Sequence, residues 1–359
     1  MSNVGNMLRL ARQRKGVTQK AAASGLGINQ PVLSRFENGA ADPDDALLVK
    51  AAQVYEIPRA FFNLKDPVYG PAVSVHPMPR AKASVTARDL DMVTAELNIR
   101  SMQLRRFLEG VEYSPEYDLP RFDVESYGTP TKVAALLRAH WRLPPGPIRN
   151  LTTLVERAGA VVAHSDFGGA SVSGMTFAVP GLPPLILLNR QHPADRMRLT
   201  LAHELGHVIM HKFPTPNMED EAFEFASTFL FPPNELRSRL RGRKVTLQLL
   251  AALKPEYKMS MSAVLYAAKR ESVITPNQNR YLNIQLSKRG WKLREPSTLD
   301  FPHEIPKVLS SILTTHEKDL GFSIDDLLNF VPMYRQEFDA LYGAFGSEPP
   351  NKPRLRIVN

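Results

Sequence analysis

The sequence predicts a multidomain protein with an all-α amino-terminal domain, an α+β domain and a small helical appendage. Helical patterns separated by tight turns fill the first 40 residues, and short apolar strands accompany amphipathic helices between residues 131 and 266. With 359 residues, of which 43% are hydrophobic, the chain is long enough for two or three separate cores. We therefore expect several globular units.

The amino-terminal region has the pattern helix, tight turn, helix. An amphipathic helix opens at Met7–Arg12, a capped short helix with a glycine turn follows over Thr18–Ile28, and another helix is expected over Asn29–Gly39. Residues 1–40 contain six basic residues against one acidic residue, Glu37. This local excess of positive charge, within a chain of net charge +9, suits contacts to DNA phosphates.

Within this region, Thr18-Gln19, Gly27 to Gln30 and Leu33 to Gly39 resemble the phage repressor/Cro type of helix-turn-helix domain, the XRE family, over about residues 3–63. The resemblance implies an all-α, five-helix-type domain that lays the second helix of the pair in the major groove of a double-stranded DNA operator. It assigns DNA contacts to five positions: Gln19, Gln30, Pro31, Ser34 and Arg35. Ala22 and Pro31 depart from the family pattern, which has a large aliphatic and a small polar residue there. The alternative is a small helical interaction domain that does not bind DNA.

The pentad His203-Glu204-Leu205-Gly206-His207 lies in a tract with helical apolar spacing and no internal proline. Residues i and i+4 share a helix face, so His203 and His207 can present two imidazoles to one metal ion while Glu204 leans over the same site. This arrangement is a zinc hydrolase signature. His211 lies one turn farther on, and we interpret it as structural.

A catalytic zinc site needs a third protein ligand and an open position for water. The chain has no cysteine, which excludes thiolate ligands and disulfides and leaves His, Asp or Glu. A second helix is expected over Met218–Leu230, and it carries four carboxylates: Glu219, Asp220, Glu221 and Glu224. Its apolar face should pack against the first helix and turn Glu219, but neither Asp220 nor Glu224, toward the metal. Glu221 is the runner-up.

The run Asp195–His207, the stretch Met218–Pro232 and the later stretch Leu253–Leu265 resemble the ImmA/IrrE family of zinc metallopeptidases over about residues 130–298. The resemblance implies an α+β metallopeptidase domain with Zn²⁺ on His203, His207 and Glu219.

In the mechanism that the resemblance implies, Glu204 takes a proton from zinc-bound water and passes it to the leaving amine of a cleaved peptide. One position departs from the family. Phe223 stands where the family usually has Asn or Asp, and loss of a hydrogen-bonding group beside the ligands could lower metal affinity or activity ~10 to 100-fold.

Secondary structure in the metallopeptidase region is expected in three groups. Helices are expected over Thr131–Leu143 and Asn150–Ala158, and strands over Gly159–His164, Ser171–Val179 and Leu185–Asn189. The last strand either lies in the core or offers an exposed edge to an extended substrate. The pattern over Leu247–Tyr266 predicts helix, turn, helix, which serves as support for the metal helices or as a second nucleic-acid contact.

The whole chain divides into four regions. We expect a helix-turn-helix domain at residues 1–64, a Pro-rich connector and long helix at 65–125, the metallopeptidase-like domain at 126–298, and a helical appendage with a flexible tail at 299–359. The long helix, over Ala87–Tyr113, carries an apolar stripe. The stripe either mediates a homodimer or packs on the metallopeptidase domain. Both alternatives stay open, because fewer than ~3 to 4 heptads do not establish a coiled coil.

Two functions from different classes fit these patterns. The first is a DNA-binding transcriptional regulator with a zinc-dependent endopeptidase domain that cleaves a repressor or antitoxin-like protein in a stress, mobile-element or defence response. The alternative is a transcriptional regulator whose zinc-site domain senses a ligand or signal without peptidase activity. No apolar run approaches the ~18 residues that a membrane span requires, and no basic-then-apolar leader opens the chain, so we expect a cytoplasmic protein without a membrane partner.

Overall fold

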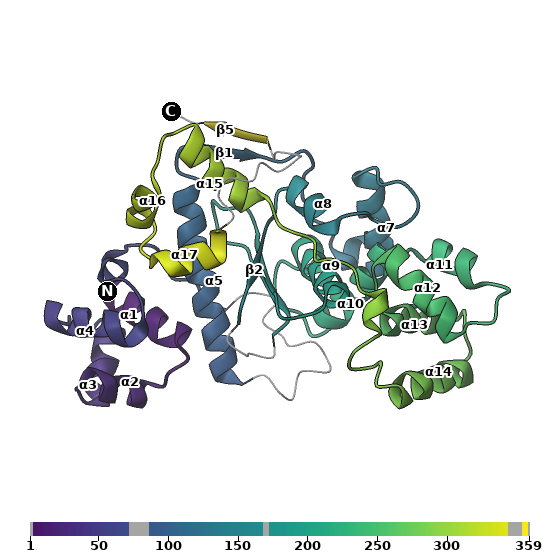
Figure 1. Ribbon diagram of the computed structural model, residues 1–359, viewed down its shortest axis with the longest axis horizontal. Helices are drawn as coiled ribbons and strands as arrows, with labels where there is room; N and C mark the ends of the chain where they lie inside the picture. Colours follow the sequence, from purple (N-terminus) through teal and green to yellow (C-terminus); the bar gives the residue numbers. More distant parts are fainter. Residues whose placement is uncertain (1–2, 72–85, 168–171, 344–353, 358–359) are drawn as a thin grey trace.

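The computed structural model describes residues 3–71, 86–167, 172–343 and 354–357. The amino-terminal domain is helical, as the sequence predicts (Figure 1). Its elements are α1 (Asn3–Arg14), α2 (Gln19–Leu26), α3 (Gln30–Glu37), α4 (Asp45–Tyr55) and the short 3-10 helix η1 (Arg59–Asn63). Thr18 caps α2 by accepting a hydrogen bond from the backbone N–H of Ala21, and Gly27 ends that helix at a positive φ of 74°. Thr18 and Gly27 therefore set where α2 begins and ends, and Gly27 starts the turn that leads to α3.

Helix α5 (Ala87–Phe107) runs between the amino-terminal domain and the rest of the molecule (Figure 1). One set of its side chains, Ala95, Ile99 and Met102, belongs to the core of the amino-terminal domain. Another set, which includes Val93 and Leu97 of the predicted stripe, packs with the sheet and the carboxy-terminal helices. Of the two alternatives for the stripe, the structure fits packing within the chain.

The long helix is shorter than the sequence analysis expects. It ends at Phe107, Gly110 has a positive φ of 79°, and Val111–Ser114 form strand β1. The prediction of a helix to Tyr113 is wrong at this end, because β1 finds backbone partners in a strand more than 200 residues away, β5 (Arg354–Ile357), with Val111 opposite Ile357. Residues 344–353 and 358–359 of the expected flexible tail lie outside the described residues, and β5 stands within the tail as a paired strand.

A small mixed sheet lies at the centre of the α+β unit. Its strands are β2 (Val161–Ser165), β3 (Gly174–Phe177) and β4 (Leu185–Asn189). The order is β2-β4-β3, with β2 parallel and β3 antiparallel to β4. Because β4 has a neighbour on each side and all of its residues are buried, it offers no edge to a substrate. The core-strand alternative is therefore the right one.

Helices precede and follow this sheet in the chain, and those at residues 233–288 lie farthest from the amino-terminal domain (Figure 1). Before it come α6 (Val124–Tyr127), α7 (Pro130–His140) and α8 (Leu151–Arg157), and after it come α9 (Ala194–Met210) and α10 (Met218–Leu230). The chain continues through α11 (Pro233–Leu240), α12 (Leu247–Tyr257), α13 (Met261–Arg270) and α14 (Pro276–Lys288). Apolar residues of α12 and α13, such as Leu253 and Val264, share one core with Leu205 of α9 and Phe225 of α10. This packing favours the support role for the 247–266 helix pair.

The carboxy-terminal elements are η2 (Ser297–Leu299), α15 (Val308–Lys318), α16 (Ile324–Phe330) and α17 (Arg335–Tyr342). They do not stand apart as an appendage. Ile312 of α15 and Phe338 of α17 are fully buried in the same core as β4 and α5. No helix in the described part of the chain is both long and apolar enough to cross a membrane.

Gly174 tests the close packing of α9 on β3. A Cβ atom at this position would lie 2.5 Å from Cγ2 of Thr200 and 3.1 Å from the carbonyl oxygen of Leu187. We expect Gly174→Ala to lower the free energy of unfolding by about 1–3 kcal/mol, the usual cost of overpacking, as measured by urea denaturation. The matched control is Gly70→Ala, where an added Cβ lies more than 4 Å from every atom of the described residues. Equal unfolding midpoints for the two variants would contradict this account.

Candidate metal centre

Helix α9 positions the residues of the His-Glu-Leu-Gly-His pentad. It packs against the sheet on one side and α10 on the other, so His203, Glu204 and His207 are each only 3% exposed. Gly206 faces α10, where a Cβ atom would lie 3.0 Å from the Phe225 ring and 3.4 Å from Cα of Ala222. The absent side chain lets the two helices come close together, which brings the first turn of α10 over the two histidines.

Three donor groups converge at this place. Nε2 of His203 and Nε2 of His207 lie 3.0 Å apart, and the Glu219 carboxylate lies 3.3 Å from the His207 nitrogen and 3.4 Å from the His203 nitrogen. Among the described residues, neither Glu219 oxygen has a hydrogen-bond partner, although the side chain is buried. Buried polar groups without partners are costly, and a divalent cation held by all three would satisfy them. Two imidazoles and one carboxylate form a donor set that suits zinc.

The protonation of these groups also suits a cation. Burial lowers the pKa of His207 to about 4, so its imidazole is neutral at pH 7 and keeps a lone pair for a metal. Burial alone would raise the pKa of Glu219, but the nearby imidazoles of His203 and His207 outweigh that effect and lower the pKa to about 2. The carboxylate is therefore ionised at neutral pH.

The structure also shows contacts to these residues that sequence reasoning missed. The hydroxyl of Thr176, on β3, donates a hydrogen bond of 2.8 Å to Oε2 of Glu204. No sequence motif marks this threonine, because its partner lies 28 residues away and only the sheet brings them together. The hydrogen bond orients the Glu204 carboxylate at the edge of the site.

His211 and Glu221 contact each other outside the three converging donors. Nδ1 of His211 lies 3.0 Å from Nδ1 of His207, and Nε2 of His211 lies 2.9 Å from the Glu221 carboxylate. Glu221, the runner-up ligand, thus contacts His211 rather than the three converging donors. Such a chain fixes the orientation of the His207 ring, in the way that partners of metal-binding histidines commonly do. The sequence signal was the continuing i+4 series from His203 through His207 to His211.

The other carboxylates of α10 point elsewhere. Asp220 is exposed, and Glu224 accepts hydrogen bonds from the backbone N–H and the hydroxyl of Thr131. Phe223 packs its ring edge-on against Tyr266 of α13, with ring centroids 5.0 Å apart. It makes an apolar contact where the resemblance leads us to expect a hydrogen-bonding group.

The residues expected to contact DNA lie together on α2 and α3. Gln30, Pro31 and Arg35 are exposed and Ser34 is partly buried. Gln19, at the start of α2, accepts a hydrogen bond of 2.8 Å from the Gln30 amide.

This face is held from beneath by a buried ion pair. The Arg12 guanidinium contacts both carboxylate oxygens of Glu37, at 2.6 and 2.9 Å, and Glu37 also accepts a hydrogen bond from Gln19. Ala22 is buried in the core, and Pro31 sits in the first turn of α3, where proline is tolerated.

Comparison with known proteins identifies both regions. Residues 155–269 match the family described as the IrrE N-terminal-like domain (Peptidase_M78), and residues 8–62 match a helix-turn-helix family. The chain is a fusion of an XRE-type helix-turn-helix domain with an ImmA/IrrE-type peptidase domain. It is also similar to the HTH-type transcriptional regulator ImmR of Bacillus subtilis (strain 168), with 38% identity over 66 residues. That match covers 18% of this chain and 52% of the relative, so the chain spans about half the length of that protein.

The two matches contain the groups of side chains described above. The peptidase-family match includes α9 and α10 with the three converging donors, and the helix-turn-helix match includes α2 and α3. The carboxy-terminal helices α15, α16 and α17 lie beyond both matches.

A metal analysis tests the donor set. We expect the purified protein to bind about one zinc ion per chain, because three protein ligands make a stable catalytic site. Alanine at His203, His207 or Glu219 should strongly reduce the zinc content, whereas alanine at Glu221 or Glu224 should change it little. Inductively coupled plasma mass spectrometry of the five variants measures this. Full zinc in Glu219→Ala together with loss in Glu221→Ala would show that the third ligand is Glu221.

Proposed function

We propose that this protein is a DNA-binding transcriptional regulator with a zinc-dependent endopeptidase domain, which cleaves a repressor or antitoxin-like protein in a stress, mobile-element or defence response. The observation that carries the proposal is the buried convergence of His203, His207 and Glu219 beside Glu204. A helix-turn-helix domain in the same chain supports the regulatory half, as does the similarity to a relative named as a transcriptional regulator.

The proposed reaction depends on the position of Glu204. When bound, zinc would lower the pKa of a coordinated water to about 7 and polarise the substrate carbonyl. Glu204 accepts the proton of the attacking water and later delivers it to the leaving amine of the cleaved peptide. Thr176 keeps the carboxylate in place by its hydrogen bond to Oε2, and the apolar surroundings of α9 keep bulk water away. Because water is the nucleophile, no covalent intermediate with the enzyme forms.

The proposed DNA contact uses the exposed face of α3. Gln30 and Arg35 can reach base edges or backbone phosphates when α3 lies in the major groove, and Gln19 at the start of α2 extends the same face. The Arg12–Glu37 pair makes the face rigid by holding α1, α2 and α3 together, since Glu37 also binds Gln19.

A second candidate function is regulation without cleavage, in which the metal domain senses a ligand or signal. The observation that favours it is the contact of Phe223 with Tyr266, an apolar pair where the family usually has a hydrogen-bonding residue. Without a hydrogen bond to orient the metal-binding side chains, catalytic activity would fall more readily than the stability of the fold.

The DNA contact is tested by two substitutions on α3. Arg35→Ala and Gln30→Ala should each weaken binding to the specific site by ~1 to 3 kcal/mol, because each removes a contact to a base edge, while binding to random DNA should change less. Fluorescence anisotropy with the upstream region of the protein's own gene measures both. If the wild-type chain binds no fragment of that region at low salt, the DNA-binding part of the proposal is wrong.

Cleavage is tested by Glu204→Gln. Glutamine keeps the shape of the side chain but cannot act as a base, so this variant should keep zinc, folding and DNA binding while losing cleavage. Wild type and Glu204→Gln are expressed beside the repressor or antitoxin-like protein encoded next to the gene, and partner length and promoter output are followed under the inducing stress.

Partner cleavage and derepression with wild type alone support the peptidase. Identical regulation by both proteins, with an uncut partner, would contradict peptidase activity and favour a metal domain that only senses a ligand or signal. The zinc content of the variant serves as the control for an intact site.

A further inference from the structure

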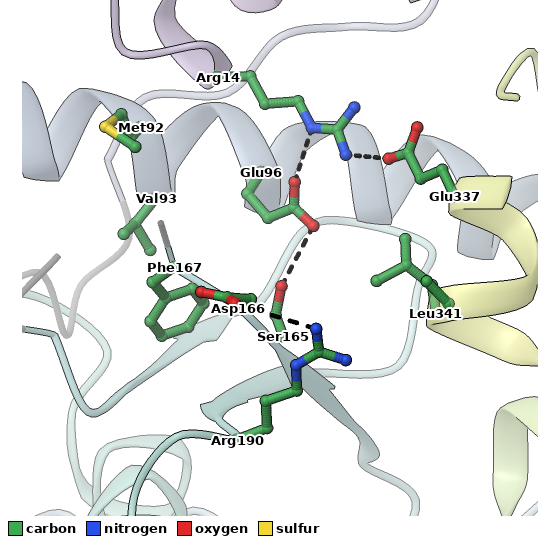
Figure 2. A pocket seen from close by; sticks show the side chains of 11 residues that line it. Arg14, Met92, Val93, Glu96, Ser165, Asp166, Phe167, Arg190, Glu337 and Leu341 are labelled. Atoms are coloured by element: carbon green, nitrogen blue, oxygen red, sulfur yellow. Dashed lines mark hydrogen bonds and ion pairs between the residues drawn. The ribbon is translucent and has the colours of Figure 1, made fainter. Parts of the chain in front are cut away.

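A cavity of about 290 Å³ lies away from the metal donors, where four parts of the chain meet (Figure 2). Arg14 enters it from the end of α1, Glu96 from α5, and Glu337 from α17. The fourth part consists of Asp166 and Arg190, which directly follow the carboxyl ends of β2 and β4. These two strands are parallel, and the carboxyl ends of parallel strands are a common place for ligands in folds with such sheets.

Part of the charge around the cavity is already paired. Arg14 lies between two carboxylates, with its Nε 2.9 Å from Glu96 and its terminal nitrogen in contact with Glu337. Glu96 also accepts a hydrogen bond of 3.3 Å from the Ser165 hydroxyl. Figure 2 shows these contacts as one continuous chain along one wall. This wall therefore joins the helix-turn-helix domain, the long helix and α17.

Arg190 differs from Arg14. Its side chain is 52% exposed, and its guanidinium lies 3.9 Å from a carboxylate oxygen of Asp166, too far for a good hydrogen bond. Among the described residues, the guanidinium donates no hydrogen bond to any acceptor. A planar guanidinium with available donors is suited to a carboxylate from a ligand.

The balance of charge narrows the class of ligand. Among the described residues, two arginines and three carboxylates line the cavity, which gives a formal charge of −1. A ligand with only negative charge would therefore add to an existing excess, whereas a ligand with both a carboxylate and an ammonium group would not. Asp166 lies beside Arg190 and already accepts a hydrogen bond of 3.0 Å from the side-chain amide of Gln191. A carboxylate can accept several hydrogen bonds, so one zwitterion can contact both Arg190 and Asp166. The remaining lining includes apolar residues, with Val93 and Phe167 on one side and Leu341 on the other (Figure 2).

We propose that this cavity binds a free α-amino acid with an apolar side chain, with its carboxylate on Arg190, its ammonium group on Asp166 and its side chain against Phe167. The volume is at the lower end of the range for ligand pockets, which suits a molecule of this size. Arg14 of the helix-turn-helix domain and the residues after β2 and β4 line the cavity together, so a bound ligand contacts both parts of the molecule. This site is separate from the metal donors and does not depend on the peptidase proposal.

The binding test uses the full-length protein and isothermal titration calorimetry with L-leucine, L-methionine and L-phenylalanine. Saturable binding of at least one of them, with one molecule per chain, is expected. Two analogues of leucine each lack one charge: 4-methylpentanoate has no ammonium group and 3-methylbutylamine has no carboxylate. Each should bind at least about 10-fold more weakly than leucine, because each loses a charge-assisted contact. The proposal is overturned if none of the three amino acids binds, or if 4-methylpentanoate binds as tightly as leucine.

The location is tested by matched arginine variants. Arg190→Gln should weaken binding of the amino acid that binds best by at least about 10-fold. Arg335→Gln is the control, because Arg335 on α17 has the same 52% side-chain exposure and also pairs with a carboxylate, Asp339, but does not line the cavity. Both substitutions lie at exposed positions, and circular dichroism with zinc content verifies the fold. Undiminished binding by Arg190→Gln would overturn the proposed location.

A third variant separates the two charged contacts. Asp166→Asn should weaken the binding of leucine while leaving the binding of 4-methylpentanoate unchanged or stronger, because only the ammonium group loses its partner. An equal loss for both molecules would contradict the assignment of Asp166 to the ammonium group.

Discussion

The burial of α9 between the sheet and α10 is the constraint on which the rest of the structure depends. A helix that is covered on both sides cannot leave polar side chains in water, so His203 and His207 must find partners inside the protein. Two missing side chains, at Gly206 and Gly174, allow the neighbours to come close enough to supply them. Glu219 of α10 then contacts both histidines, and Thr176 of β3 donates a hydrogen bond to the neighbouring Glu204. The same packing that excludes water thus assembles the polar site.

Helix α5 provides the second connection that holds the molecule together. Its buried Asn98 donates to and accepts from the backbone of Tyr69, and Arg106 forms a two-point ion pair with Asp66. These contacts attach the segment that follows the helix-turn-helix domain, at Asp66 and Tyr69, to helix α5. Because α5 contributes to the amino-terminal core and to the sheet core at once, the two domains share a structural element rather than a loose linker. A change in the packing of one domain can therefore reach the other through α5.

Particular elements show how far the sequence could lead. Helix α10 was expected over the range at which it forms, and β4 over its observed bounds, because 3.6-residue periodicity and a short apolar run between turn residues are local signals. The end of the long helix was misjudged, since apolar residues at Leu108 and Val111 continue its spacing although Gly110 bends the backbone and β1 pairs with a distant strand. The contact between Glu221 and His211 was also out of reach, because it depends on how closely the first turn of α10 approaches the end of α9.

The sequence by itself determined the metal-type pentad, the helix that follows it and the helix-turn-helix pattern, because each depends on residues within one or two helical turns of one another. Only the tertiary structure decided that Glu221 contacts His211, that Thr176 holds Glu204, and that Arg14 and Arg190 border one cavity. The physical reason is the same in each case. These contacts join side chains from elements that are separate in the sequence, and their distances are set by how closely whole helices and strands pack, which local spacing does not encode.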